Sequence, residues 1–156
     1  MNAYEEGLEV LETLFARDYQ FALATSNDNI PAVRFIDTFY DSGAFYIVTY
    51  GKSQKVKEIE KNPVVALSKD LYRFNGVARN IGHPLSKENL IIREKLIKIF
   101  EPWYFAHNDE SDENMCFVRV DLKKGLFYKD GTGYKVDFDS KTAEKFPFVF
   151  DIIKID

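Results

Sequence analysis

Three lysines crowd the expected start of a short helix, and they are the residues of this chain best placed to do chemistry. Lys52, Lys55 and Lys57 come first, and the acidic residues Glu58 and Glu60 follow them. The N-terminus of a helix carries partial positive charge and unpaired amide N–H groups, so it normally attracts Asp or Glu rather than cations. Cations are stable there when an anion lies among them, and phosphate is the usual one. This charge order therefore predicts a binding site for a phosphorylated ligand.

Ser53 and Arg34 provide further groups for the same anion. Ser53 has the residue type of a helix N-cap, and its hydroxyl can equally bind a phosphate. Arg34 belongs to a mostly apolar segment, where alternation places it on one face with Ile36 and Thr38. A guanidinium in such surroundings needs an anionic partner, because an unpaired buried charge is costly. The alternatives are a salt bridge or an exposed strand edge for Arg34, and a solvated lysine face for the helix start.

The other polar and aromatic candidates carry weaker signals. His83 and His107 match no metal-ligand spacing, and we expect both to be loop histidines. Cys116 alternates with valines, which predicts a core residue, and the acidic segment 108–114 lacks the glycine and spacing of an EF-hand. We expect Trp103 in the core or an interface, with stacking on an aromatic ligand as the alternative. No dinucleotide, phosphate-loop or nucleophile-elbow glycine motif is present.

Composition limits the class of protein. The chain has 156 residues, so we expect one domain spanning residues 1–156 with a core that needs neither disulfides nor a structural metal. Hydrophobic residues make up 46% and the net charge is −4, which argues against disorder and against a general attraction to nucleic acid or anionic membrane. No apolar run approaches the roughly 20 residues that span a bilayer. With an acidic N-terminal segment that lacks a signal-peptide pattern, these features predict a soluble cytoplasmic protein.

Hydrophobic periodicity predicts an α+β chain. The expected helices cover residues 3–16, 53–61 and 86–100. The expected strands cover residues 21–25, 30–40, 45–49, 64–68, 73–81, 115–121 or 115–128, and 134–138. Short polar turns join the first three strands into an antiparallel meander, and the whole pattern predicts a small antiparallel barrel. The apolar tail at residues 146–155 is expected to pack on the body or on a second subunit.

This order of elements resembles the FMN-binding split-barrel family related to pyridoxamine 5′-phosphate oxidase, especially its small general-stress-protein-like members. The resemblance rests on Phe21-Ala-Leu-Ala-Thr25, on Pro31-Ala-Val-Arg34, on Phe45-Tyr-Ile-Val-Thr49, and above all on Lys52-Ser-Gln-Lys-Val-Lys57 before residues 62–67. It covers residues 19–67 and extends more weakly to about residue 128. It implies a small antiparallel split β-barrel with flanking helices, in which FMN lies in a cleft at a homodimer interface.

The resemblance also implies which residues contact the phosphate. Arg34 resembles the arginine that reaches the FMN phosphate, and Ser53 and Lys55 resemble the contacts at the helix start. Lys52 joins them from the charge argument alone. Where the family often reads Ser-Arg-Lys, this chain has Gln54, which removes one phosphate contact.

The function implied by the resemblance is that of an FMN-dependent oxidoreductase with a small-molecule electron donor and acceptor. Ile47, Val48 and Thr49 resemble the strand that lies along the flavin. Residues 146–156 do not match the Arg-rich end that serves the vitamin substrate of the true oxidase, which argues against oxidation of pyridoxamine phosphate. Because a flavin carries its own redox chemistry, no catalytic side chain is assigned. The alternative is a non-catalytic stress or sensing protein that binds flavin, deazaflavin, heme or another nucleotide.

Overall fold

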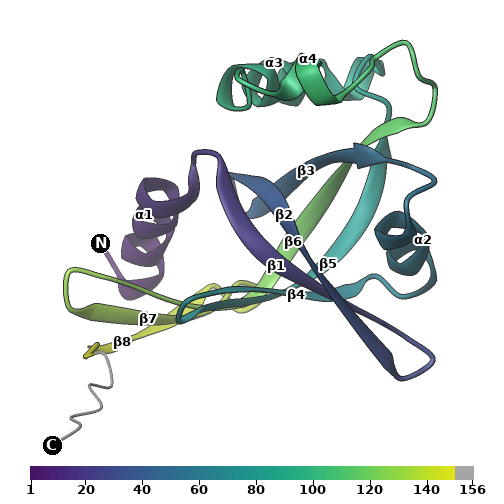
Figure 1. Ribbon diagram of the computed structural model, residues 1–156. Coiled ribbons are helices and arrows are strands. Elements are labelled where there is room, and N and C mark those ends of the chain that lie inside the picture. Colours follow the sequence, from purple (N-terminus) through teal and green to yellow (C-terminus); the bar gives the residue numbers. More distant parts are fainter. Residues whose placement is uncertain (150–156) are drawn as a thin grey trace, which may run out of the picture.

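Antiparallel strands dominate the part of the chain that the computed structural model describes, residues 1–149 (Figure 1). The strands are β1 (Tyr19–Asn27), β2 (Ile30–Asp41), β3 (Ala44–Tyr50), β4 (Val64–Lys69), β5 (Tyr72–Gly82), β6 (Met115–Lys129), β7 (Thr132–Asp137) and β8 (Thr142–Pro147). The helices are α1 (Ala3–Phe15), α2 (Gln54–Lys61), α3 (Leu90–Ile99) and α4 (Tyr104–His107), with a 3₁₀ turn at Lys87–Asn89. Neighbours follow the order β3-β2-β1-β4-β5-β6-β7-β8, and β3 also pairs with β6. This extra pairing closes six strands into a barrel, which confirms the predicted fold class.

Two-residue turns set the register of the first three strands. Asp28 and Asn29 join β1 to β2, and Ser42 and Gly43 join β2 to β3. All four residues have positive φ, between 49° and 88°. This is the backbone of a type I′ turn, whose twist matches that of the flanking strands. The predicted antiparallel meander is therefore confirmed.

β2 and β3 separate soon after their turn, and this separation is the split in the barrel. They share three residue pairs, of which the last joins Phe39 to Tyr46. Beyond that pair, β2 continues along β1 while β3 continues along β6. Within the described chain, residues 35–38 and 47–50 therefore face the split without pairing to each other.

α2 follows β3 at the open end of the split. Val56 and Ile59 are buried in the apolar core inside the barrel, so the apolar side of the helix faces the protein interior. The helix contacts β1 and β5, and Figure 1 shows it close to the end of β3. Gly51 in the preceding loop donates its amide hydrogen to the carbonyl oxygen of Asn114 at 2.6 Å. The loop that leads into α2 is thus tied to the chain just before β6.

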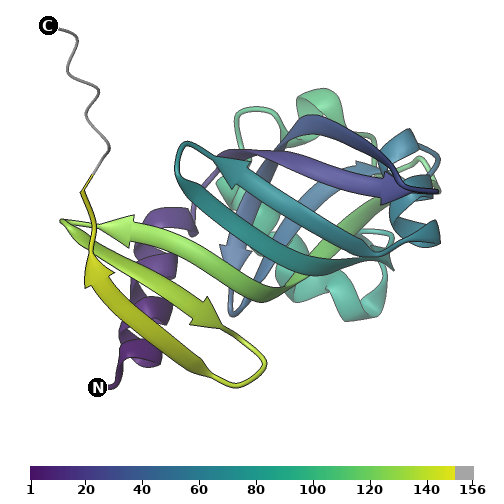
Figure 2. The ribbon, with the colours of Figure 1, turned by 90° about the horizontal axis from the view of Figure 1, so that it is seen from below.

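Apolar side chains form two cores, one inside the barrel and one outside it. The inner core is built around Phe15, Phe21, Phe45 and Phe74, whose ring centroids are 5.1–5.8 Å apart. The outer core joins α3 and α4 to the outer faces of β3 and β6. α1 lies against the β7–β8 arm that extends from the barrel (Figure 2). Within residues 1–149, no helix is both long enough and apolar enough to cross a membrane.

Some elements differ from the sequence-based prediction. β6 takes the longer of the two predicted extents, and α3 begins at Leu90 because residues 87–89 form a 3₁₀ turn. α4 and β8 were not predicted. Four of the six residues of β8 are exposed, and its apolar residues Ala143, Phe146 and Pro147 do not alternate with polar ones, so the segment shows no hydrophobic alternation.

The start of the apolar tail packs on the body, as predicted. The ring of Phe146 covers Gly133, where an added Cβ would lie 2.4 Å from it. Phe148 stacks on Tyr128 with centroids 4.0 Å apart. The rest of the predicted contact, at residues 150–156, lies outside the described residues.

Candidate functional site

The start of α2 contains a buried hydroxyl without a partner. Ser53 is the N-cap residue, yet its side chain makes no capping hydrogen bond. Its Oγ is buried and has no hydrogen-bond partner among the described residues. A buried polar group left unpaired is costly, and the first amides of any helix also lack partners within it. The helix start therefore has donors in place for a ligand oxygen.

Lys55 is the second residue of the same helix and is half-buried. Its Nζ donates a hydrogen bond to Thr49 Oγ1 of β3 at 2.9 Å. Burial lowers the pKa of Lys55, and the nearby charge of Arg34 lowers it further. No carboxylate of residues 1–149 forms an ion pair with it. A partly desolvated cation of this kind is stabilised by an incoming anion.

Arg34 already has an anionic partner within the protein. Its Nη2 lies 2.6 Å from Glu58 Oε2 of α2. Its Nη1 donates to Thr25 Oγ1 at 2.9 Å and to the carbonyl oxygen of Leu23 at 3.3 Å. The predicted alternative of a salt bridge is thus observed, while a phosphate contact of Arg34 stays a prediction.

Glu58 is the acceptor at the centre of this arrangement. Thr25 donates its hydroxyl to Glu58 Oε2 at 2.5 Å, and Gln54 donates its amide to Oε1 at 3.2 Å. The hydrogen bond from Thr25 is the largest cause that lowers the pKa of Glu58, followed by those from Gln54 and Arg34. The carboxylate therefore stays ionised at neutral pH.

A cavity of about 570 Å³ occupies the split between β2 and β3. It is lined by Phe35, Ile36 and Asp37 of β2, by Ile47, Val48, Thr49 and Tyr50 of β3, and by Lys55, Trp103, His107 and Asn108. The structure thus brings Ile47, Val48, Thr49 and Lys55 of the predicted site to one cavity. Ser53 lies two residues from Lys55, and Lys52 is exposed beside the helix start.

Trp103 and His107 form one wall of this cavity, a role that the sequence did not assign to either residue. The expectation of a loop histidine is wrong for His107, because it is the last residue of α4. Trp103 donates its indole N–H to Asp18 Oδ2 at 2.9 Å, and its ring lies 4.4 Å from that of Phe100. His83 lies elsewhere, because its ring nitrogens meet the backbone of Leu85 and Asp112. Alternation and spacing could not predict this wall, because α4 spans only four residues, which is too short for a helical period to be detected.

An ion pair holds this wall in place. Arg93 of α3 makes two hydrogen bonds to the Glu110 carboxylate, both 2.7 Å long. The hydroxyl of the buried Tyr104 donates to the same carboxylate at 2.9 Å. The Arg93 hydrogen bonds lower the pKa of Glu110, so the carboxylate is ionised and the bidentate pair is complete at neutral pH.

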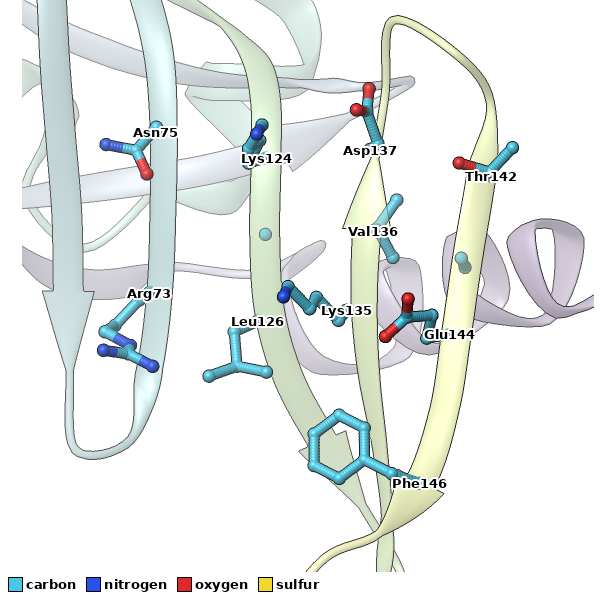
Figure 3. A pocket seen from close by; sticks show the side chains of 12 residues that line it. Arg73, Asn75, Lys124, Leu126, Lys135, Val136, Asp137, Thr142, Glu144 and Phe146 are labelled. Carbon is cyan, nitrogen blue, oxygen red and sulfur yellow. The ribbon is translucent and has the colours of Figure 1, made fainter.

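A larger cavity, of about 780 Å³, lies away from the split on the outer face of the β5–β8 strands. Figure 3 shows Arg73, Leu126, Lys135 and Glu144 in a row across these strands, as their register requires. It contains none of the residues predicted from sequence. Its cations alternate with Asp137 and Glu144, so it is an open, mixed-charge surface and we do not assign the site there.

The fold agrees with the comparison to known families. The family model described as pyridoxamine 5′-phosphate oxidase matches residues 8–129. The chain belongs to the pyridoxamine 5′-phosphate oxidase family. No curated protein matches the sequence.

Solved structures share the barrel of this pyridoxamine 5′-phosphate oxidase family member. General Stress Protein 26 from Bacillus anthracis str. Sterne is 19% identical, with 90% of this chain and 97% of that chain covered and a TM-score of 0.56. A FAD-binding protein from Mesorhizobium loti is 16% identical, with coverages of 76% and 90% and a TM-score of 0.59. A heme binding protein from Mycobacterium smegmatis is 12% identical, with coverages of 90% and 60% and a TM-score of 0.64. At these identities the likeness establishes the fold alone.

Cys116 does not add a nucleophile to the candidate site. Its side chain is buried in the inner core, as alternation predicted. Burial raises the pKa of the thiol to about 11, so the thiol is neutral at physiological pH. Among the described residues, no group of three or more His, Cys, Asp or Glu side chains could hold a metal ion.

Proposed function

We propose that this chain binds FMN in the split of its barrel, with the phosphate at the start of α2. The observation that carries the proposal is the buried, unpartnered Ser53 hydroxyl next to the half-buried Lys55, which has no acidic partner among the described residues. A phosphate oxygen accepts hydrogen bonds from both side chains and from the first amides of the helix. The exposed Lys52 adds positive charge at the same end.

The flavin ring would lie along β3. Ile47, Val48 and Thr49 line the cavity with Trp103 across from them. Its volume of about 570 Å³ falls within the roughly 300–1,000 Å³ typical of small-molecule sites. The backbone of residues 47–50 does not pair with β2, so its polar groups on that edge are open to a ligand. FMN joins a planar ring to one phosphate, which suits an apolar slot with a cationic end.

A bound flavin supplies electron transfer, and the protein supplies position and electrostatics. We therefore propose an oxidoreductase that takes electrons from one small molecule and passes them to another, located in the cytoplasm. Lys55 and Ser53 hold the phosphate, β3 orients the ring, and Trp103 restricts the access of water. No side chain of this chain is assigned to proton transfer.

The site would be completed by a second copy of the chain. Val33, Phe35 and Val64 are apolar yet 69%, 75% and 60% exposed, and Phe35 also lines the cavity. Exposed apolar side chains of this size next to a cavity are typical of an interaction surface. We propose a homodimer in which this surface is covered and the cleft lies between the two protomers.

The test compares FMN with riboflavin, which lacks the phosphate. We expect the purified protein to bind FMN at least tenfold more tightly than riboflavin, because a charge-assisted hydrogen bond contributes about 1.5–3 kcal/mol. Lys55→Met and Ser53→Ala should reduce this preference, whereas Lys57→Met, on an exposed position of the same helix, should leave it unchanged. Mass spectrometry of the ligand released from the purified protein identifies FMN directly.

Two results would overturn the proposal. One is the absence of flavin binding by visible spectroscopy and calorimetry. The other is equal affinity for FMN and riboflavin that Lys55→Met does not alter. Release of FAD or heme, as expected for a ligand like that of the FAD-binding or the heme binding relative, would support the cavity as the binding site but replace FMN as the cofactor.

A further inference from the structure

Glu58 gathers the donors that would otherwise face a phosphate. Arg34, the residue expected to reach the phosphate, points its Nη2 at Glu58 Oε2 across 2.6 Å. Gln54, which occupies another expected phosphate position, donates its amide to Oε1 of the same carboxylate. Thr25 donates to Oε2 as well, at 2.5 Å. The Glu58 carboxylate therefore accepts, within the protein, hydrogen bonds that a bound phosphate would otherwise receive from Arg34 and Gln54.

The charges around the helix start follow from this arrangement. The positive charge of Arg34 is matched by the negative charge of Glu58. Their side chains are 23% and 14% exposed, respectively. Lys55 is near enough to Arg34 for that charge to lower the pKa of Lys55. Among residues 1–149, the neutral Thr49 hydroxyl is the only hydrogen-bond partner of its ammonium group. In the described part of the chain, Lys55 is therefore a partly buried cation at the helix start without a carboxylate partner. A phosphate at this site would meet the attraction of Lys55 and the repulsion of Glu58 together.

We infer that Glu58 is a residue that determines specificity for the phosphate of the ligand. Its ion pair with Arg34 leaves Lys55 as the principal cation of the phosphate site. This inference rests on the proposed phosphate site at the start of α2. Glu58 weakens the hold on a doubly charged phosphate monoester, and its effect on the neutral part of the ligand is small. Glu58 therefore lowers the preference of this chain for FMN over riboflavin. Without it, Lys52, Ser53 and Lys55 would produce a larger affinity ratio.

Glu58→Gln tests this inference, because glutamine keeps the shape and an acceptor oxygen but removes the charge. We expect FMN to bind about fivefold more tightly to this variant than to the wild-type chain, because the Arg34 guanidinium then has no charged partner within the protein and its charge attracts the phosphate. Riboflavin affinity should not change. The gain should disappear in the double variant Arg34→Gln/Glu58→Gln, because the released guanidinium produces it. Glu60→Gln, which removes the same charge from an exposed position of α2, should leave the ratio unchanged.

The readout is the affinity ratio, which a purely structural role would not alter. Thermal unfolding of each variant confirms that the chain is folded. If wild-type protein prefers FMN but Glu58→Gln leaves the ratio unchanged or lowers it, the inference is overturned while the proposed function stands. If Glu60→Gln raises the ratio as much as Glu58→Gln does, net charge is responsible and the inference is also overturned. If the wild-type protein showed no preference for FMN over riboflavin, the proposed phosphate site itself would be contradicted.

Discussion

Lys55 of α2 and Thr49 of β3 are joined by a 2.9 Å hydrogen bond between Nζ and Oγ1. Both residues also line the cavity in the split of the barrel. The cation at the helix start and the strand that would lie along a flavin are therefore parts of one site. They are six positions apart in the chain, and the strand, the loop and the helix bring the two side chains into contact.

Thr49→Val tests this relationship. The substitution keeps the branched shape but removes the hydroxyl that holds Lys55, so FMN affinity should fall roughly fivefold for the loss of about 1 kcal/mol. Isothermal calorimetry with FMN measures the change. Thr132→Val, on β7 and away from the cavity, is the matched control. Equal affinities for both variants would show that the Lys55–Thr49 contact does not support binding.

Glu110→Gln should destabilise the wall that contains Trp103. It replaces a carboxylate that accepts two hydrogen bonds from Arg93 and one from Tyr104, so the loss should be about 2 kcal/mol. The folded pKa of Glu110 is lowered from 4.5, so this stabilisation is present above pH 4.5 and is lost as the pH falls through the folded value. Urea unfolding of both proteins across this pH range measures the difference.

The exposed Glu113→Gln in the same loop serves as the control for Glu110→Gln, and it should stay within about 0.5 kcal/mol of the wild type. A stability difference between Glu110→Gln and the wild type that persists unchanged at strongly acidic pH would contradict the role of the ionised carboxylate.

Cys116 should resist alkylation in the folded protein. Burial raises the pKa of its thiol to about 11, and the thiolate is the form that reacts. Near neutral pH, iodoacetamide should modify the protein only in denaturant, as mass spectrometry would record. Rapid modification of the native chain would mean that the thiol is more accessible and more acidic than its position in the core implies.

Gly76→Ala and Gly7→Ala should have opposite effects on stability. At Gly76 an added Cβ would lie 2.7 Å from both Asp121 O and Val120 Cγ1, so the β5–β6 ladder must shift at a cost of about 1–3 kcal/mol. At Gly7, within α1, the nearest atom is 3.4 Å away, and alanine should gain up to about 1 kcal/mol of helix propensity. Thermal unfolding measures both. A neutral Gly76→Ala would show that the bulge at Asn75/Gly76 has room to relax.

Local patterns predicted much of the fold. The turns at Asp28–Asn29 and Ser42–Gly43 and the helix after Ser53 follow from residues within a few positions of one another. β8 could not be predicted from local patterns, because its sequence shows no hydrophobic alternation. The strand is defined by its pairing with β7 and its packing against α1. α4 did not follow either, because a single turn of helix leaves no period to detect.

The candidate site divides in the same way. The sequence by itself determined the charge order at the start of α2, the apolar strand beside it and the family resemblance, because these depend on neighbours along the chain. Only the tertiary structure decided that Arg34 pairs with Glu58, that Ser53 is buried without a partner, and that Trp103 faces β3. The partner of a charged side chain depends on which groups lie near it in space. A lone arginine in an apolar strand does not indicate which anion the fold will place next to it.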